Sequence, residues 1–194
     1  MALLGPVPEV PPVGNTLPIP HIPQNTEYIK AGAVTFGVEH RVLSYEISTA
    51  YFRKALATRP DDLMRKVLVK VESEGKTNYP DDEGVSIHVF GERDGHLIEY
   101  LRFDCFDEQP HYHYVFPEPS APTQRIMLDT AAEGDGMRWT MERLRTRLAP
   151  MLEHAHAVGL AKRVDRKAIE AALPKLQQAV ERMLERLPAR SAAS

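Results

Sequence analysis

The densest run of polar and aromatic side chains is Glu99–Tyr114, with the sequence EYLRFDCFDEQPHYHY. On both sides of Asp107–Pro110 its residues alternate between apolar and polar, with the period of two that is typical of β-strands. Aspartate and proline favour a turn at Asp107–Pro110 itself. We therefore predict one strand, a tight turn and a second strand.

A third strand is predicted just before this run. Val85–Phe90 also alternates, and Gly91–Gly95 contains the Asp-Gly pair that is a hairpin signal. We thus predict an antiparallel meander in which Phe90 pairs with His96 and Phe106 pairs with His111. One face then forms the core, with Val85, Ile87, Val89, Leu101, Phe103, Cys105, Tyr112, Tyr114 and Phe116. The other face carries His88, Tyr100, Arg102, Asp104, His111 and His113.

Two histidines and one carboxylate meet on the polar face. In the predicted register Asp104 lies opposite His113, and His111 lies one step along the same strand face. This is the ligand set of mononuclear zinc and non-haem iron sites, so Asp104, His111 and His113 are candidate ligands for Zn or Fe. His88 is predicted to lie too far along its strand to join them, at about 20 Å from Asp104. The alternative is a structural hydrogen bond between Asp104 and His113, with Arg102 completing the network.

The same face also supplies candidate catalytic residues for chemistry without a metal. Asp104 could orient His113, while Tyr100 or Arg102 would stabilise developing negative charge. Cys105 is predicted on the core face, where a free cysteine acts as a small apolar residue. The sequence contains no Gly-rich phosphate loop, Cys-x-x-Cys pair or His-Glu-x-x-His motif, so no organic cofactor is predicted.

Composition narrows the class of protein. A chain of 194 residues with 43% hydrophobic residues suits one packed domain. Its net charge of -3 argues against nucleic-acid binding, and its single cysteine excludes an internal disulfide. There is no apolar run long enough to cross a membrane and no signal-peptide pattern. We therefore expect a cytoplasmic protein.

The N-terminal segment differs from the rest of the chain. Residues 1–26 hold seven of the sixteen prolines, and Glu9 is their only charged residue. Proline fixes φ and removes donors, so this segment is predicted to be an extended arm. Its spaced aliphatic side chains indicate an arm that lies on a surface. The predicted organisation is an arm at 1–26, a single α+β domain at 27–188 and a tail at 189–194.

Further elements are predicted around the meander. Tyr28–Ile47 favours one or two strands, and Ser48–Thr58 a helix. Leu63–Glu72 is ambiguous, because Val67, Val69 and Val71 alternate like a strand whereas Asp61-Asp62 would start a helix well. We predict a strand there, with a loop over Glu74–Gly84. Gln124–Thr130 is predicted as one further strand.

The C-terminal third reads as a helical hairpin. Asp135 is predicted to cap a first helix that Pro150 kinks or restarts and Gly159 closes, and Asp165 to cap a second. Each helix carries an apolar stripe. The stripes are Met137, Met141, Leu144, Leu148, Met151 and Ala155, and Ile169, Leu173, Leu176, Val180, Met183 and Leu187. We expect both to pack on the sheet; the alternative is an interface with a partner.

The overall prediction is an α+β fold, with an antiparallel sheet packed against a C-terminal helical hairpin and an extended proline-rich arm. The segment Glu99–Tyr114, and more faintly Met137–His154, resembles a motif of an uncharacterised bacterial family that is known only as a domain of unknown function. That resemblance implies no activity, fold or ligand.

Two functions are compatible with these patterns. The first is a non-catalytic accessory or structural subunit of a larger cytoplasmic assembly, bound through its arm and helical hairpin to a protein partner or to a second copy. The alternative is a small mononuclear metal-dependent enzyme that uses His111, His113 and Asp104. Neither function involves nucleic acid or a membrane.

Overall fold

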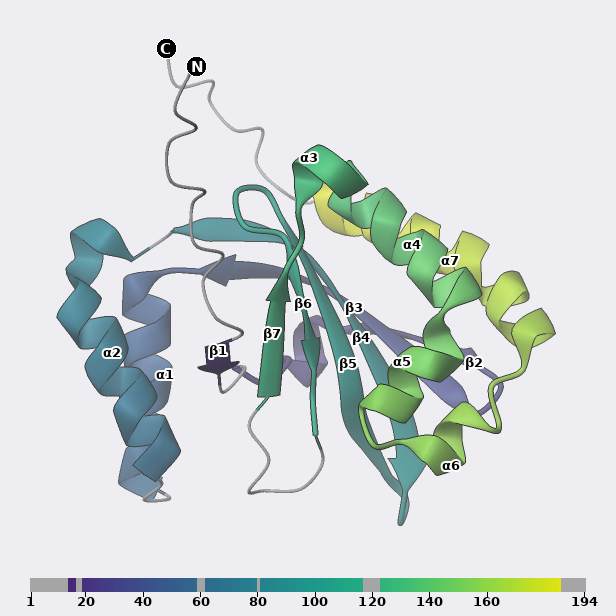
Figure 1. The fold of residues 1–194 in the computed structure, drawn as a ribbon, viewed down its shortest axis with the longest axis horizontal. Helices are drawn as coiled ribbons and strands as arrows, with labels where there is room; N and C mark the ends of the chain where they lie inside the picture. Colours follow the sequence, from purple (N-terminus) through teal and green to yellow (C-terminus); the bar gives the residue numbers. More distant parts are fainter. Residues whose placement is uncertain (1–13, 17–18, 59–61, 80, 117–122, 186–194) are drawn as a thin grey trace, which may run out of the picture.

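The computed structural model describes residues 14–16, 19–58, 62–79, 81–116 and 123–185. The first half of the predicted arm, residues 1–13, and the predicted tail at 189–194 lie outside this part. The described residues form an antiparallel sheet in the order β1-β7-β6-β5-β4-β3-β2 (Figure 1). Its strands are β1 Gly14–Thr16, β2 Glu27–Ala31, β3 Val34–Leu43, β4 Asp82–Arg93, β5 His96–Phe106, β6 His111–Tyr114 and β7 Thr123–Met127. The predicted α+β class and antiparallel meander are therefore confirmed.

Helices lie on both sides of the sheet (Figure 1). They are η1 Pro23–Asn25, α1 Tyr45–Thr58, α2 Asp62–Asn78, α3 Thr130–Glu133, α4 Gly136–Thr146, α5 Leu148–His154, α6 Val158–Ala161 and α7 Arg166–Glu185. The group α4–α7 covers one face, and α1 and α2 pack on each other on the opposite side (Figure 1). None of the helices in the described ranges is long and apolar enough to cross a membrane.

The C-terminal helices bury their apolar stripes on the sheet, as predicted. Leu144, Leu152 and Leu176 are fully enclosed in one core with the apolar side chains of β3, β4 and β5. Asp135 caps α4 by accepting from the Arg138 backbone, and Asp165 accepts from the first turn of α7. The described residues of both apolar stripes are therefore packed in the core of the domain or against it.

Apart from Tyr100 and Glu99, the predicted faces of the meander are correct, but its register is wrong. In the structure Arg93 pairs with His96 and Val89 with Leu101, because a two-residue turn at Asp94 and Gly95 joins the strands. Both turn residues have positive φ, 53° and 76°, as a type I′ hairpin turn requires. Around Val89 the shift from the predicted pairing is four residues. An even shift keeps every side chain on its predicted face.

A β-bulge changes the faces at one point. Val89 pairs with Leu101 and Phe90 with Glu99, so Tyr100 is the extra residue on β5. Tyr100 joins the core, with 8% of its surface exposed, while Glu99 turns to the polar face. The prediction that Tyr100 shares a face with Asp104 is therefore wrong.

Two further predictions are corrected. Leu63–Glu72 is not a strand, and Glu74–Gly84 is not one loop, because α2 runs to Asn78 and β4 begins at Asp82. The less exposed side chains of α2 recur at helical spacing, with Met64, Val67 and Val71 among them. The alternating valines concealed this second periodicity.

The end of the first C-terminal helix also differs from the prediction. Gly159 lies inside α6, and the chain instead leaves α5 through His156, whose φ is 61°. Pro150 falls in the first turn of α5, a separate helix that begins after Arg147, which agrees with the predicted restart.

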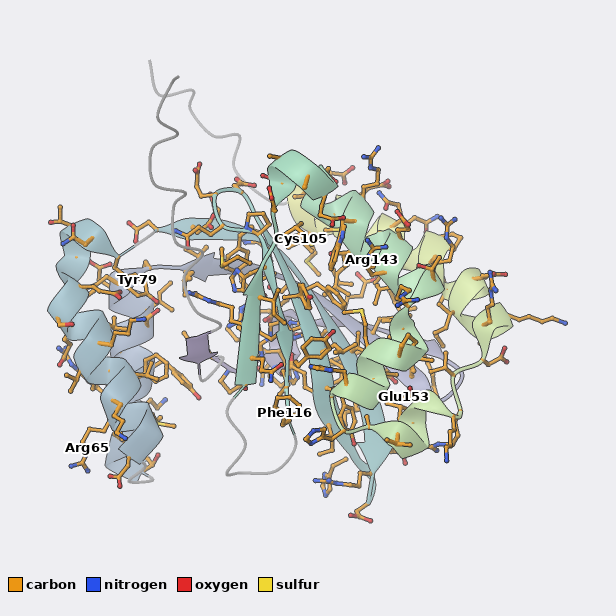
Figure 2. The ribbon with its side chains drawn as sticks, viewed as in Figure 1. Arg65, Tyr79, Cys105, Phe116, Arg143 and Glu153 are labelled. Carbon is orange, nitrogen blue, oxygen red and sulfur yellow. The ribbon has the colours of Figure 1, made fainter. Side chains whose placement is uncertain are left out.

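We predict that Cys105 is unreactive in the folded protein. Its sulfur lies 3.4 Å from Thr140 Oγ1 and 3.7 Å from the Gly136 carbonyl oxygen, between β5 and α4 (Figure 2). Burial raises the pKa of the thiol to about 12. A thiol reagent at about pH 8.5, where an exposed cysteine is half ionised, should react rapidly only after denaturation. Cys105→Ala should lower the free energy of unfolding by about 1 kcal/mol.

Candidate metal centre

Charged and polar side chains line the sheet face that lies opposite α4–α7. Cross-strand pairing places Ser86 beside Asp104 and Asp104 beside His111, and in the next row it places His88 beside Arg102 and Arg102 beside His113. These side chains are buried, with exposed fractions between 0% and 7%. Because burying unpaired polar groups is costly, this face must be organised by specific contacts.

Asp104, His111 and His113 converge on one point. The Oδ2 atom of Asp104 lies 3.3 Å from His111 Nε2 and 3.2 Å from His113 Nε2. The three residues each offer a ligand atom within 4.8 Å of the other two. The predicted ligand set is thus assembled in the structure, although Asp104 lies opposite His111 rather than opposite His113 as predicted.

The ring of His111 is held by a backbone carbonyl. Its Nδ1 atom lies 2.6 Å from the carbonyl oxygen of Gln109. A carbonyl only accepts hydrogen bonds, so Nδ1 carries the proton and, in the neutral ring, Nε2 presents a lone pair to Asp104. This carbonyl contact is the arrangement that orients histidine ligands in metal sites.

The protonation of the other two residues also suits a metal. Burial raises the pKa of Asp104, but contacts with His111 and His113 outweigh this effect, and the resulting pKa lies well below its ordinary value. Burial lowers the pKa of His113 to about 4, despite the nearby Asp104 carboxylate. At neutral pH the site therefore offers a carboxylate and a neutral imidazole, and Ser86 Oγ donates to the second oxygen of Asp104.

The two separations between the Asp104 oxygen and the histidine nitrogens match those between ligands of one metal ion. Zinc binds histidine nitrogen and carboxylate oxygen at about 2.0–2.2 Å, and tetrahedral angles then separate two ligand atoms by about 3.3–3.4 Å. Charge-assisted hydrogen bonds are shorter, at about 2.7–2.9 Å. The observed 3.2 Å and 3.3 Å are nearer to the first pattern.

Beside this triad lies a second cluster around Arg102. Its Nε and Nη2 atoms donate to the two oxygens of Glu99, each at 2.8 Å, and Glu99 Oε1 also lies 2.6 Å from His88 Nδ1. On the far side of His88, Glu39 Oε1 lies 3.3 Å from Nε2. Arg102 therefore pairs with Glu99 and not with Asp104, which corrects the predicted network.

Three members of this cluster, Glu39, Arg41 and Glu99, were missed by the sequence reasoning. Glu39 and Arg41 come from β3, far away in sequence, and strict alternation put Glu99 on the wrong face. His88 was also misplaced, since it lies directly opposite Arg102 rather than near Ile98. The sequence held one usable signal for this cluster. The alternation placed the Glu99 carboxylate on a strand face whose other side chains are apolar.

The chain before β2 is fastened to this cluster. The carbonyl oxygen of Ile19 accepts from Arg102 Nη1 and Arg41 Nη2, both at 2.8 Å, and the Ile22 N–H donates to Glu39 at 3.0 Å. The described part of the predicted arm therefore packs on its own domain, with β1 paired to β7 at the sheet edge.

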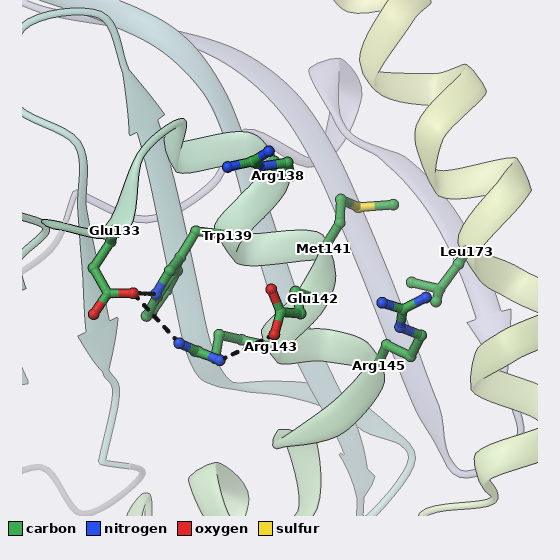
Figure 3. Close-up of a pocket in the computed structure, with 8 residues that line it drawn as sticks. All are labelled: Glu133, Arg138, Trp139, Met141, Glu142, Arg143, Arg145 and Leu173. Atoms are coloured by element: carbon green, nitrogen blue, oxygen red, sulfur yellow. Dashed lines mark hydrogen bonds and ion pairs between the residues drawn. The ribbon is translucent and has the colours of Figure 1, made fainter. Parts of the chain in front are cut away.

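A separate groove of about 490 Å³ lies outside α4 (Figure 3). Glu133 accepts from the Trp139 indole at 3.0 Å and lies 3.5 Å from Arg143, whose guanidinium stands 5.0 Å above the Trp139 ring. Arg143 also lies 3.5 Å from Glu142. Glu133 and Glu142 compensate Arg143, and the groove is an open surface, so we place the candidate site on the buried face.

We predict that Glu99→Gln destabilises the protein in a pH-dependent way. The variant leaves Arg102 buried without its carboxylate, which should cost about 3 kcal/mol in the free energy of unfolding. Burial raises the pKa of Glu99, but Arg102 and His88 outweigh it and hold the pKa far below 4.5. The stabilisation by the carboxylate is therefore present above pH 4.5 and is lost as the pH falls further.

Urea unfolding of both proteins from pH 7 to below pH 4.5 measures this effect. The difference between wild type and Glu99→Gln should shrink as the solution is acidified. The exposed Glu92→Gln on β4 is the control and should change stability little at any pH. An equal loss for the two variants at pH 7 would contradict the assignment.

Comparison with known proteins gives a family but no activity. No curated protein and no solved structure matches the chain. A family described as a domain of unknown function, DUF7700, matches residues 28–180, which include the sheet from β2 to β7 and most of α7. The chain therefore belongs to the DUF7700 family.

Proposed function

We propose that this protein is a mononuclear metal-dependent enzyme in which Asp104, His111 and His113 hold one zinc or ferrous ion. The observation that carries the proposal is the approach of both Nε2 atoms to the same carboxylate oxygen, at 3.3 Å and 3.2 Å. Because Nδ1 of His111 donates to the Gln109 carbonyl, a neutral ring would direct its Nε2 lone pair at this oxygen, and two such atoms repel unless a cation lies between them.

The ligand number supports a catalytic rather than a structural ion. Structural zinc is almost always closed by four protein ligands, whereas catalytic zinc has three and keeps one position for water or substrate. Two histidines and one carboxylate are also the ligands of non-haem iron enzymes. The separations are nearer to tetrahedral zinc, so we expect zinc to bind more tightly than ferrous iron.

The other residues of the face support the ligands. Ser86 fixes the carboxylate through its second oxygen, and the Gln109 carbonyl fixes the His111 ring. Arg102 lies directly opposite His113, but each of its three nitrogens donates to Glu99 or Ile19, so its role in this proposal is electrostatic and structural. Tyr100 lies in the core and takes no part.

Metal analysis tests the proposal directly. Protein purified without an affinity tag should contain one zinc or iron ion per chain, and His111→Ala or His113→Ala should lose most of it. At free zinc of 100 times Kd, binding should raise the free energy of unfolding by about 2.7 kcal/mol. Thermal melts with and without zinc measure this second effect.

The exposed His96→Ala is the matched control, because it removes an imidazole from β5 outside the triad. It should retain the metal of the wild type. Circular dichroism verifies that the triad variants are folded. A wild-type protein that takes up no metal, or triad variants that bind as much as the control, would refute the centre.

A role as an accessory subunit remains a second proposal. It rests on the composition of residues 1–13, which are aliphatic and proline-rich with Glu9 as the only charged side chain. The described stripes of the C-terminal helices are buried on the sheet, so the arm is left as the binding element. The partner would be a protein, or a second copy, in a cytoplasmic assembly.

Deletion of residues 1–13 tests this second role. The truncated chain should stay folded, because the sheet core and the contacts of Ile19 and Ile22 remain. Light scattering coupled to size-exclusion chromatography should show a lower mass than the full-length protein if the arm joins copies. Equal masses, together with equal co-purified proteins, would count against an interaction arm.

A further inference from the structure

The turn between β5 and β6 is held by a buried carboxylate outside the triad. Asp82, the first residue of β4, is 3% exposed. Its Oδ1 accepts from the Glu108 N–H at 3.1 Å, and its Oδ2 from the Gln109 N–H at 2.8 Å. Two successive peptide groups of the turn are therefore fixed by one side chain.

The residue that Asp82 holds, Gln109, also contacts a proposed ligand through its carbonyl. Asp82 fixes the N–H of Gln109, and the carbonyl of Gln109 accepts from His111 Nδ1. Further along the turn, the Pro110 carbonyl accepts from the Leu128 N–H at 2.9 Å. Gln109 is thus fastened on both sides, which leaves its carbonyl little freedom to turn away.

The Gln109 carbonyl imposes the Nδ1–H tautomer on His111. Without this carbonyl, a metal-free site would favour the other tautomer, with the proton on Nε2. Asp104 Oδ2 lies 3.3 Å from His111 Nε2, so a proton on Nε2 could donate to the carboxylate. The Gln109 carbonyl instead places the proton on Nδ1 and points the lone pair of Nε2 at Asp104. This arrangement suits a metal ion and is unfavourable without one.

We infer that Asp82 is a positioning residue for the metal centre: by holding the Gln109 N–H it keeps the next peptide's carbonyl, that of Gln109, on His111, so that His111 stays in the Nδ1–H tautomer with its Nε2 free to ligate. The expected effect of Asp82 on zinc affinity rests on the proposed function. Its control of the His111 tautomer does not. Loss of a group that is hydrogen-bonded to a ligand changes metal affinity by about 10–100-fold, and Asp82 acts on such a group, the Gln109 carbonyl.

Asp82→Asn tests the inference. Asparagine has one acceptor oxygen and a donor NH2 group, so it cannot accept from both turn amides through separate oxygens. In metal-free protein, the ring 15N shifts of His111 should move from the Nδ1–H pattern toward Nε2–H. Zinc affinity, measured by competition with a chromophoric chelator, should fall by about 10–100-fold.

The neighbouring Asp81→Asn is the matched control, because it makes the same chemical change at an exposed position. It should leave both the tautomer and the zinc affinity unchanged. Asp82→Glu keeps the charge and both oxygens but displaces them by one methylene group. It should change the His111 15N shifts and the zinc affinity in the same direction as Asp82→Asn, but by less. It replaces Asp82→Asn as the test variant if Asp82→Asn does not fold.

The two readouts separate the inference from the proposed function. Wild-type protein that binds no zinc overturns the metal centre, while the 15N shifts still decide whether Asp82 controls His111. An unchanged His111 tautomer in the folded Asp82 variants overturns the inference, even if their melting temperatures fall. A changed tautomer with unchanged zinc affinity also overturns it, because positioning would then have no effect on the ligand.

Discussion

The bidentate pair between Arg102 and Glu99 is the interaction on which the polar face depends. Residues three apart on a regular strand point to opposite faces of a sheet. The bulge at Tyr100 removes this obstacle, since it turns Glu99 to the side of Arg102 and gives the tyrosine ring to the core. One extra residue thus supplies a buried counter-charge and a core aromatic together.

The consequences of this pair extend across the sheet and into the N-terminal segment. With two of its nitrogens on Glu99, Arg102 directs its third toward the Ile19 carbonyl, where Arg41 from β3 also donates. Glu99 in turn holds His88. A buried ion pair of this kind gains little net stability, but removing one partner is costly. The Arg102–Glu99 pair therefore adds little to the stability of the fold. Its main effect is to restrict which segments of the chain can cover the polar face.

Local patterns predicted the strands, their faces and the triad, because each depends on short-range alternation. Asp104, His111 and His113 lie on two neighbouring strands joined by a short turn, so errors of two or four residues in register left them on one face. The bulge could not be predicted, since it is determined by burial of Tyr100 and pairing of Glu99. Neither could the contribution of β3, because no local pattern links Glu39 to His88.

The two clusters of the polar face differ in their charge balance, and this difference supports a cation at the triad. Around His88, two carboxylates face two guanidinium groups, those of Arg41 and Arg102. Within the described part of the chain no guanidinium group pairs directly with Asp104, since the three nitrogens of Arg102 donate to Glu99 and Ile19, and burial keeps His113 neutral. A buried carboxylate needs compensation by positive charge, and neutral imidazoles carry no charge but are good metal ligands. A divalent ion, as proposed, would supply that charge at the point where the three ligand atoms already meet.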